Sequence, residues 1–592
     1  MGRRRQRVLT FVVFLAGLAL PAGASFAQAD QDTLLPDLAP REMEILGNLE
    51  ITFPQLRRQP LSGFNPPPRI YEVPRGWRPW TGDYKQPSAD LPGTSLIQPV
   101  SPPATISVGQ HPHKGELSLG IGRYLSREVR AQAAFDLGPN VVMYGSAFHE
   151  GLDKFEPFDD TLGTEAPEQN YDGVAGLTYR SGATSAGVEV SGFFRELDLY
   201  GARADTAPFA SPERDGQGFG GKVWVATGET SKLPVLLSAE YRANTFETSL
   251  TGAEFAPSVD GSLLAVAGET KFGMGGRSLQ LDGQVSITGQ EGIFAPLDSM
   301  LMVDSKNDVT TYRTGGELRI ETGKRSVLRV GAQMHGYSVS QSFSAVGLQT
   351  FDESKLYVAP RISFVNMIAS GTEIYVKNTP IVLVSDQSEM FRFNPFLVDG
   401  ALALPELSVV NVEGGIVFYK GPVRVAARSG ITTYESLRYF AGSDSPFFGP
   451  GFFDVHYGNA DVLFAGGDIG VTFPGQFSAT ISGQWQSAKL DNDLDVPYYP
   501  KFDGGLRASY VFADDRALLQ VDGKFVGERN VDAIASRQLS GYVDMAFLGS
   551  YYFENGVGIF GRVHTMTGDT FERWDGYPVA DWVTLGGIRL RW

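Results

Sequence analysis

The chain has 592 residues, a formal net charge of −17 and no cysteine, and aromatic residues make up 12% of it. The lack of cysteine excludes a fold that depends on disulfides. The negative charge argues against binding to nucleic acid, because an acidic surface repels a phosphate backbone. No stretch of about 18–20 consecutive apolar residues occurs, so membrane-spanning helices are not expected.

Residues 1–27 have the pattern of a signal peptide. Four arginines lie among the first seven residues, and an apolar run follows from Leu9 to Leu20. Ser25 and Ala27 supply the small residues that precede a cleavage site, so we expect cleavage after Ala27. An exported chain of this composition is either soluble or a β-barrel whose hydrophobicity is spread over alternating positions.

Residues 28–114 contain 15 prolines, among them Pro66-Pro67-Pro68. Proline fixes φ and has no N–H, so this segment is expected to be extended rather than part of a sheet. We interpret it as a periplasmic arm that side chains such as Ile51, Phe53 and Trp77 could anchor. A tether, a partner-binding arm and a filler of a barrel lumen all remain open.

From residue 115 to residue 592 the pattern changes to strands with period-2 alternation. In the last segment Arg589 and Arg591 share one face, while Ile588, Leu590 and Trp592 share the other. A barrel strand can place arginines in a wet lumen and apolar residues against lipid. A terminal tryptophan suits the membrane–water interface. We therefore expect residues 582–592 to be the closing strand of an outer-membrane barrel.

The connections between these strands alternate between short and long. Ten short, turn-rich links occur, including the hairpin signal Asn555-Gly556. Ten longer stretches and a tight link at Leu125-Ser126 lie between them. These connections predict an all-β fold: a transmembrane antiparallel β-barrel of about 22 strands (115–592) with a proline-rich N-terminal extension. Both ends of the barrel then lie on the short-turn side, which is periplasmic in bacterial outer-membrane barrels.

Two segments resemble those of TonB-dependent receptors. Residues 571–578 (Phe-Glu-Arg-Trp-Asp-Gly-Tyr-Pro), followed by the last strand, are similar to the C-terminal end of those barrels. Asn394-Pro395-Phe396-Leu397, Pro405-Glu406 and Asn411-Val412-Glu413-Gly414 resemble a motif found midway around them. The resemblance covers the barrel and implies an outer-membrane location. It does not extend to residues 28–114, where no plug domain is recognisable.

The resemblance implies a transport or permeation barrel for a small solute, without a plug. The alternative is a structural or docking barrel of an outer-membrane protein complex. Outer-membrane lipid is the expected partner, with envelope proteins possible at the 28–114 arm or the external loops. Because a 22-stranded barrel would be wider than porins of about 16–18 strands, we expect closure by folded-in loops such as 379–406 and 439–459, by the arm, or by another protein.

Aromatic residues crowd two of the long loops and are the candidate ligand or partner residues. Binding a ligand or partner and packing of the loops on one another are equally compatible with this composition. The set comprises Phe391, Phe393, Phe396, Phe440, Phe447, Phe448, Phe452, Phe453 and Tyr457.

No arrangement of residues predicts catalysis, a cofactor or a metal site. His111 and His113 have no nearby acidic or cysteine partner. The triad Asp491, Asp493 and Asp495 lacks the glycine and the bidentate glutamate of a calcium loop. We therefore expect the chain not to be an enzyme.

Overall fold

The computed structural model describes residues 114–592 apart from 159–164, 203–210, 229–232, 250–256, 275–276, 295–302, 324, 344–350, 444–450, 474–475, 514–515 and 565–570. The predicted signal peptide (1–27) and all but the last residue of the predicted arm (28–114) lie outside the described residues. The first strand begins at Gly115.

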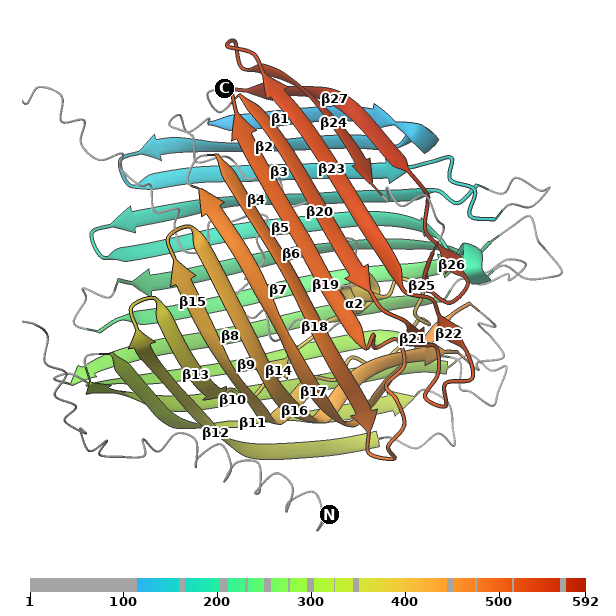
Figure 1. Cartoon of the computed structure of the whole chain (residues 1–592). Helices are drawn as coiled ribbons and strands as arrows, with labels where there is room; N and C mark the ends of the chain where they lie inside the picture. Colours follow the sequence, from blue (N-terminus) through green and yellow to red (C-terminus); the bar gives the residue numbers. More distant parts are fainter. Residues whose placement is uncertain are drawn as a thin grey trace, which may run out of the picture. The chain divides into compact units, whose positions relative to one another are not determined.

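One large antiparallel sheet forms the wall of the barrel (Figure 1). Its strands are β1 (Gly115–Gly122), β2 (Arg127–Gly138), β3 (Val141–Leu152), β4 (Glu168–Ser181), β5 (Thr184–Asp198), β6 (Glu213–Thr227), β7 (Val235–Ser249), β8 (Ser258–Met274), β9 (Arg277–Phe294), β10 (Val303–Gly323), β11 (Ser326–Phe343), β12 (Phe351–Ala369), β13 (Thr372–Asn378), β14 (Val382–Leu383), β15 (Glu406–Lys420), β16 (Val423–Gly442), β17 (Phe453–Phe473), β18 (Phe477–Leu490), β19 (Phe502–Phe512), β20 (Ala517–Val526), β23 (Tyr542–Tyr552), β24 (Val557–His564) and β27 (Val583–Arg591).

Short elements occur in the connections between the wall strands. They are the 3-10 turns η2 (Arg123–Leu125) and η3 (Tyr200–Ala202), the helix α2 (Gln387–Phe393), and two small hairpins, β21 (Arg529–Asn530) with β22 (Gln538–Leu539) and β25 (Glu572–Trp574) with β26 (Tyr577–Pro578). Within the described residues no helix has the length and hydropathy of a membrane span.

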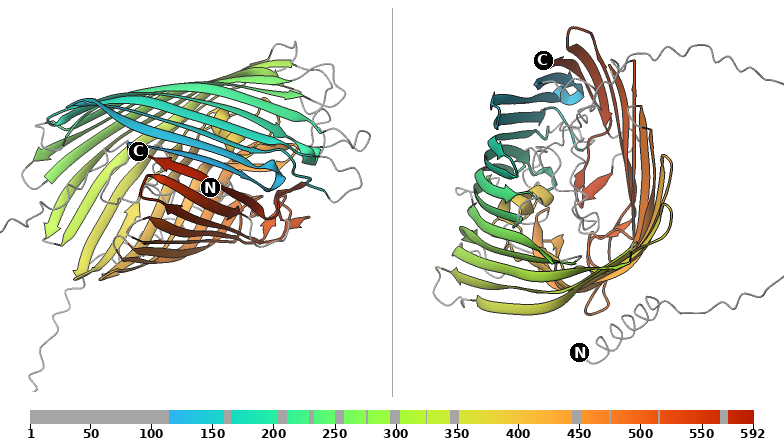
Figure 2. Two further views of the ribbon diagram at one scale, coloured as in Figure 1. Left: turned by 90° about the horizontal axis from the view of Figure 1, so that it is seen from above. Right: turned by 90° about the vertical axis from the view of Figure 1, so that its left-hand side faces the viewer.

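The sheet closes on itself because its first and last strands pair. Antiparallel β1 and β27 align Glu116 with Arg591 and Gly122 with Leu585, and the two strands lie side by side in Figures 1 and 2. The short strand β14 pairs with β15, as β13 does, so 22 strands surround the lumen. The predicted all-β barrel of about 22 antiparallel strands is confirmed.

The predicted alternation of short and long connections matches the strand boundaries. At the short turn between β23 and β24, Gly556 has φ +82°, a conformation that favours glycine. A Cβ atom at Gly556 would also lie 2.4 Å from the carbonyl oxygen of Arg591. The hairpin expected from Asn555-Gly556 therefore forms, and the glycine allows the last strand to approach closely.

The outer face of the wall carries a band of exposed apolar side chains. On neighbouring strands β8 and β9, Leu264, Val266, Val285 and Ile287 are each 44–52% exposed. Residues that alternate with them along the strand, such as Ala267, point to the other side of the sheet. A closed barrel with such a band is the form in which strands span a bilayer, because every backbone group pairs within the sheet. The chain is an outer-membrane β-barrel.

Several long connections fold into the barrel rather than away from it. Figure 2 shows α2 inside the ring of strands. The connection from 379 to 405, which contains α2, contributes Met390 and Leu397, both 0% exposed, to the largest hydrophobic cluster. We call residues 379–405 the inserted segment.

An arginine on the outer face should destabilise the barrel more than one on the adjacent lumenal position. Val266→Arg places the charge in the apolar band and should cost about 2–4 kcal/mol of folding free energy near the midplane. Ala267→Arg faces the lumen and should cost much less. Urea titrations of the two variants folded into lipid vesicles measure the difference, and equal stabilities would contradict the assigned faces.

Candidate functional site

The aromatic side chains predicted as ligand or partner residues converge in the structure. Six of them are at most 7% exposed and belong to a single cluster: Phe391, Phe393, Phe396, Phe440, Phe452 and Phe453. Phe447 and Phe448 lie outside the described residues. Tyr457 lies on β17, where its hydroxyl accepts a hydrogen bond from the backbone N–H of Leu404 at 3.0 Å. The loops thus pack on one another, and binding of a ligand by these rings stays a prediction.

The cluster is completed by aromatic residues that the sequence did not single out as site residues. The ring of Tyr577 stacks on Phe396, and the ring of Trp574 packs against Tyr498 and Phe453 at 4.8 and 5.2 Å between centroids. Trp574 and Tyr577 belong to the 571–578 segment, which carried only the family resemblance. No local sequence pattern predicted that these two residues lie next to the inserted segment.

A close backbone contact joins two of the long connections beside this cluster. Gly451 has φ +90°, and a Cβ atom there would lie 2.2 Å from the carbonyl oxygen of Gly201. Burial raises the pKa of Tyr577 well above its ordinary value. Its hydroxyl therefore stays protonated and donates to the carbonyl oxygen of Gly451 at 2.8 Å. Only glycine fits position 451 without strain.

Arg214 on β6 holds the C-terminal half of the inserted segment. Its guanidinium lies 3.3 Å from the carboxylate of Asp399, and the two side chains are 3% and 0% exposed. It also donates to the carbonyl oxygen of Pro395 at 2.5 Å and to the hydroxyl of Thr248 at 2.9 Å. Its carbon Cζ lies 4.3 Å from the ring centroid of Phe391. The guanidinium thus contacts both the inserted segment and the wall.

Arg242 on β7 holds the start of α2. Its guanidinium contacts the carboxylates of Asp386 and Glu389 at 3.1 and 2.8 Å. Asp386 is the N-cap of α2 and accepts the backbone N–H of Glu389 at 2.9 Å. Burial raises the pKa of Glu389, and Arg242 opposes this shift. The pairing therefore favours the charged carboxylate at this position.

Arg438 on β16 forms the third contact. It pairs with Glu406 at 2.9 Å, and the two side chains are 7% and 1% exposed. It donates to the hydroxyl of Ser385 at 3.1 Å and lies over the ring of Phe393. We call Arg214, Arg242 and Arg438 the latch arginines, because each connects the wall of the barrel to the inserted segment or to its C-terminal boundary.

A cavity of about 670 Å³ remains in the lumen beside the inserted segment. Strands β3 to β7 line one side of it and β18 to β24 the other, while α2 and the β25–β26 hairpin contribute aromatic side chains. The inserted segment therefore narrows the lumen without filling it.

The charged side chains of this cavity are only partly paired. The carboxylate of Asp522 contacts Arg507 at 2.7 Å, and that of Asp544 contacts Arg573 at 2.9 Å. Arg195 lies 3.9 Å from Asp172, at the outer limit of an ion pair. Arg392 on α2 and Lys524 on β20 also line the cavity. Among the described residues neither of these two cations has a hydrogen-bond or ion-pair partner.

The predicted closing strand has its two arginines on the lumenal side. Arg591 contacts Glu116 of β1 at 2.9 Å and thus links the strands that close the barrel. Arg589 is 5% exposed and lies over the ring of Phe560, so its side chain packs against the protein and is not exposed to water. Trp592 is 51% exposed on the outside.

No group of three or more His, Cys, Asp or Glu residues in the described part of the chain could hold a metal ion. In the acidic loop, Asp495 instead pairs with Lys489 and accepts a hydrogen bond from Asn530. His111 and His113 lie outside the described residues. We assign no catalytic role to any residue.

Removing a latch arginine should release the inserted segment. Arg214→Met leaves the carboxylate of Asp399 buried without its partner, which costs about 3–5 kcal/mol. Limited trypsin digestion should then cut after Arg392, which in the wild type lies on α2 inside the ring of strands (Figure 2). Arg424→Met is the control, because its pair with Asp468 is partly exposed and lies outside the inserted segment. Equal cleavage in both variants would contradict the latch.

No protein-family model matches the chain, and no curated protein matches its sequence. Its fold is similar to several solved structures. The ferric yersiniabactin uptake receptor FyuA from Yersinia pestis matches with a TM-score of 0.62 at 12% identity, over 81% of this chain and 80% of that chain. The copper transporter OprC matches with a TM-score of 0.61 at 12% identity, over 81% and 80%.

The siderophore receptor PiuA from Acinetobacter baumannii matches with a TM-score of 0.60 at 10% identity, over 81% of this chain and 82% of that chain. At such low identity the likeness to these receptors and this transporter establishes a shared fold, a large closed β-barrel.

Proposed function

We propose that this chain is an outer-membrane transport or permeation barrel for a small solute, and that the inserted segment is its constriction. The observation that carries the proposal is the cavity of about 670 Å³ that persists in the lumen beside α2. Such a volume lies in the range of sites for small molecules, which are typically about 300–1,000 Å³.

The physical need for a constriction follows from the number of strands. Barrels of about 16–18 strands already leave an aqueous channel, and wider ones have a plugged lumen. Two of the latch arginines form buried pairs, Arg214 with Asp399 and Arg438 with Glu406. Buried pairs of this kind fix one geometry, because breaking either partner leaves an uncompensated charge. This supports a permanent constriction rather than a loop that merely happens to fold inward.

The cations of the cavity can bind an anionic group of a solute. Arg392 and Lys524 line the cavity and have no ion-pair partner within the described residues, and the same holds for the acids Glu168 and Asp198. Arg392 is exposed to the cavity, whereas Lys524 is half-buried, and a half-buried cation without a close partner is costly. An anionic group in the cavity would relieve that cost through charge-assisted hydrogen bonds.

The solute names of the structural neighbours, siderophore, ferric yersiniabactin and copper, describe those proteins. The absence of a plug concerns residues 28–114, which lie almost entirely outside the described residues, and it stays a prediction. The docking role in a protein complex also stays a prediction. The bilayer recordings described below distinguish it from transport.

Planar-bilayer recordings of the purified chain in a salt gradient test the proposal. The wild type should conduct, and its reversal potential measures the preference for anions over cations. Arg392→Ala/Lys524→Ala should reduce this preference, because both unpaired cations of the cavity are removed. Lys222→Ala is the matched control, since this lysine on β6 is absent from the cavity lining. It should leave the selectivity nearly unchanged.

Two results would contradict the proposal. A correctly folded wild type that stays silent in the bilayer would favour the docking barrel. If the wild type and the double variant conduct with the same ion preference, the proposed permeation stands, but Arg392 and Lys524 do not determine the ion selectivity.

A further inference from the structure

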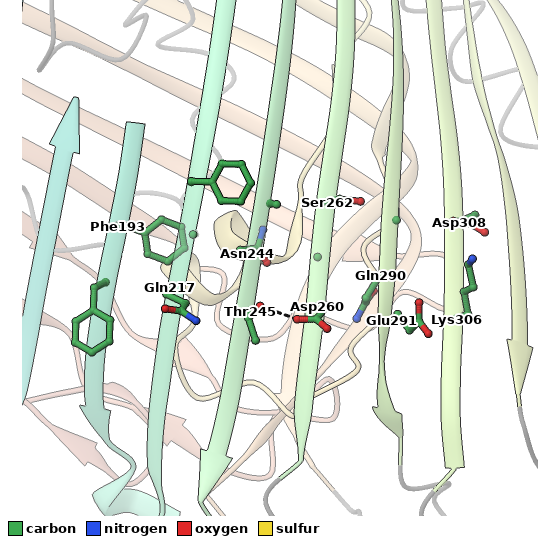
Figure 3. A pocket seen from close by; sticks show the side chains of 16 residues that line it. Phe193, Gln217, Asn244, Thr245, Asp260, Ser262, Gln290, Glu291, Lys306 and Asp308 are labelled. Carbon is green, nitrogen blue, oxygen red and sulfur yellow. Dashed lines mark hydrogen bonds between the residues drawn. The ribbon is translucent and has the colours of Figure 1, made fainter. Parts of the chain in front are cut away.

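A second hollow lies in the wall of the barrel, away from the lumenal cavity. It has a volume of about 710 Å³ and spans the loop halves of β5 to β10 (Figure 3). Strand alternation places its exposed polar side chains on the same face as the exposed apolar residues Leu264 and Ile287. The hollow therefore opens on the outer face of the barrel. We call it the outer groove.

The pairing register explains why the wall is hollow there. One cross-strand row runs from Phe219 on β6 through Ala243, Ser262 and Gly289 to Asp308 on β10. Its three central residues are small, so little side-chain volume covers the backbone at this level. The ring of Phe219, which is 62% exposed, forms one end of the row.

The row on the short-turn side of the groove is apolar. It contains Tyr241, Leu264 and Ile287, which align across β7, β8 and β9 and are 44–45% exposed. These residues belong to the band that meets hydrocarbon. The groove thus begins at the level where the acyl chains end and lipid headgroups lie.

The row on the loop side of the groove is polar. It runs from Gln217 through Thr245, Asp260 and Glu291 to Lys306. The hydroxyl of Thr245 donates to Asp260 at 2.6 Å, a bond drawn in Figure 3. Asp260 and Glu291 stand directly opposite each other on neighbouring strands. Like charges in this position destabilise a sheet unless a donor lies between them.

The side chains of the three rows indicate which class of ligand the outer groove can bind. The apolar row and the hollow above it suit an amphiphile. The carboxylates of Asp260, Glu291 and Asp308 outnumber the single cation Lys306, which disfavours an anionic headgroup and favours one rich in hydroxyl donors. An exposed aromatic ring at the end of the hollow offers a face for the apolar side of a sugar.

We propose that the outer groove binds the sugar headgroup of a glycolipid in the outer leaflet. The hydroxyl groups donate to Asp260 and Glu291, the sugar ring occupies the space above Ala243, Ser262 and Gly289, and the acyl chains follow the apolar row. This site is independent of the lumenal cavity, because the wall of the barrel separates the two. It requires only that the barrel spans the outer membrane.

Native mass spectrometry of the purified chain in a detergent without sugar, octyl tetraethylene glycol ether, tests this site. The probes are a monoglucosyl diacylglycerol and phosphatidylglycerol with matched acyl chains. We expect saturable binding of the glucolipid to the wild type. Asp260→Ala/Glu291→Ala should weaken it by about tenfold or more, the effect of losing a charge-assisted hydrogen bond. Ala243→Phe should weaken it similarly by filling the hollow.

Asp461→Ala is the control, since it removes an outward-facing acid from β17, a distant part of the wall. It should bind the glucolipid as the wild type does. The proposal is overturned if all variants bind equally, or if phosphatidylglycerol binds as tightly as the glucolipid. It is also overturned if phosphatidylglycerol binds through Asp260 and Glu291 only when magnesium chloride is present, because the groove would then hold a bridged phosphate.

Discussion

The structure depends on one constraint: in hydrocarbon every backbone N–H and C=O must pair within the protein. The pairing of β1 with β27 meets this constraint by removing the last two edges of the sheet. Closure around 22 strands then creates a bore wider than that of a porin. On the inside, the inserted segment narrows this wide bore. On the outside, the closed wall carries an apolar band that ends at a row of polar side chains.

The latch arginines hold the inserted segment inside a wide bore. The three arginines lie on three different strands of the wall. They contact carboxylates, a carbonyl oxygen and aromatic rings of the inserted segment and its C-terminal boundary. Arg214 and Arg438 give up nearly all contact with water, and this loss is offset only if their partners stay in place. Arg242 remains 30% exposed. The arrangement therefore favours a rigid segment. Under the proposed function, Arg392 and Lys524 beside it are cations available to a solute.

Much of the fold could be predicted because local sequence patterns determine it. Alternation and turn residues predicted the strand number, the hairpin at Gly556 and the outward position of Trp592. The site could not be predicted in the same way. Arg214 and Arg242 look like any lumen-facing charges of a barrel strand, and their partners Asp399 and Asp386 lie more than 140 residues away. The aromatic loops were recognised, but composition does not distinguish rings that pack together from rings that bind. The outer groove depends on the cross-strand register, which a sequence does not specify residue by residue.

Disulfide trapping tests most directly the central claim that the inserted segment is docked on the inner wall. A Cβ atom at Gly261 of β8 would lie 2.8 Å from the Cβ of Gln387 in α2, close enough for a disulfide after a small adjustment. The chain has no cysteine of its own. Gly261→Cys/Gln387→Cys should therefore form an intramolecular disulfide in the outer membrane, whereas Gly268→Cys/Gln387→Cys should not. A folded Gly261→Cys/Gln387→Cys barrel whose two thiols both remain free would contradict the account.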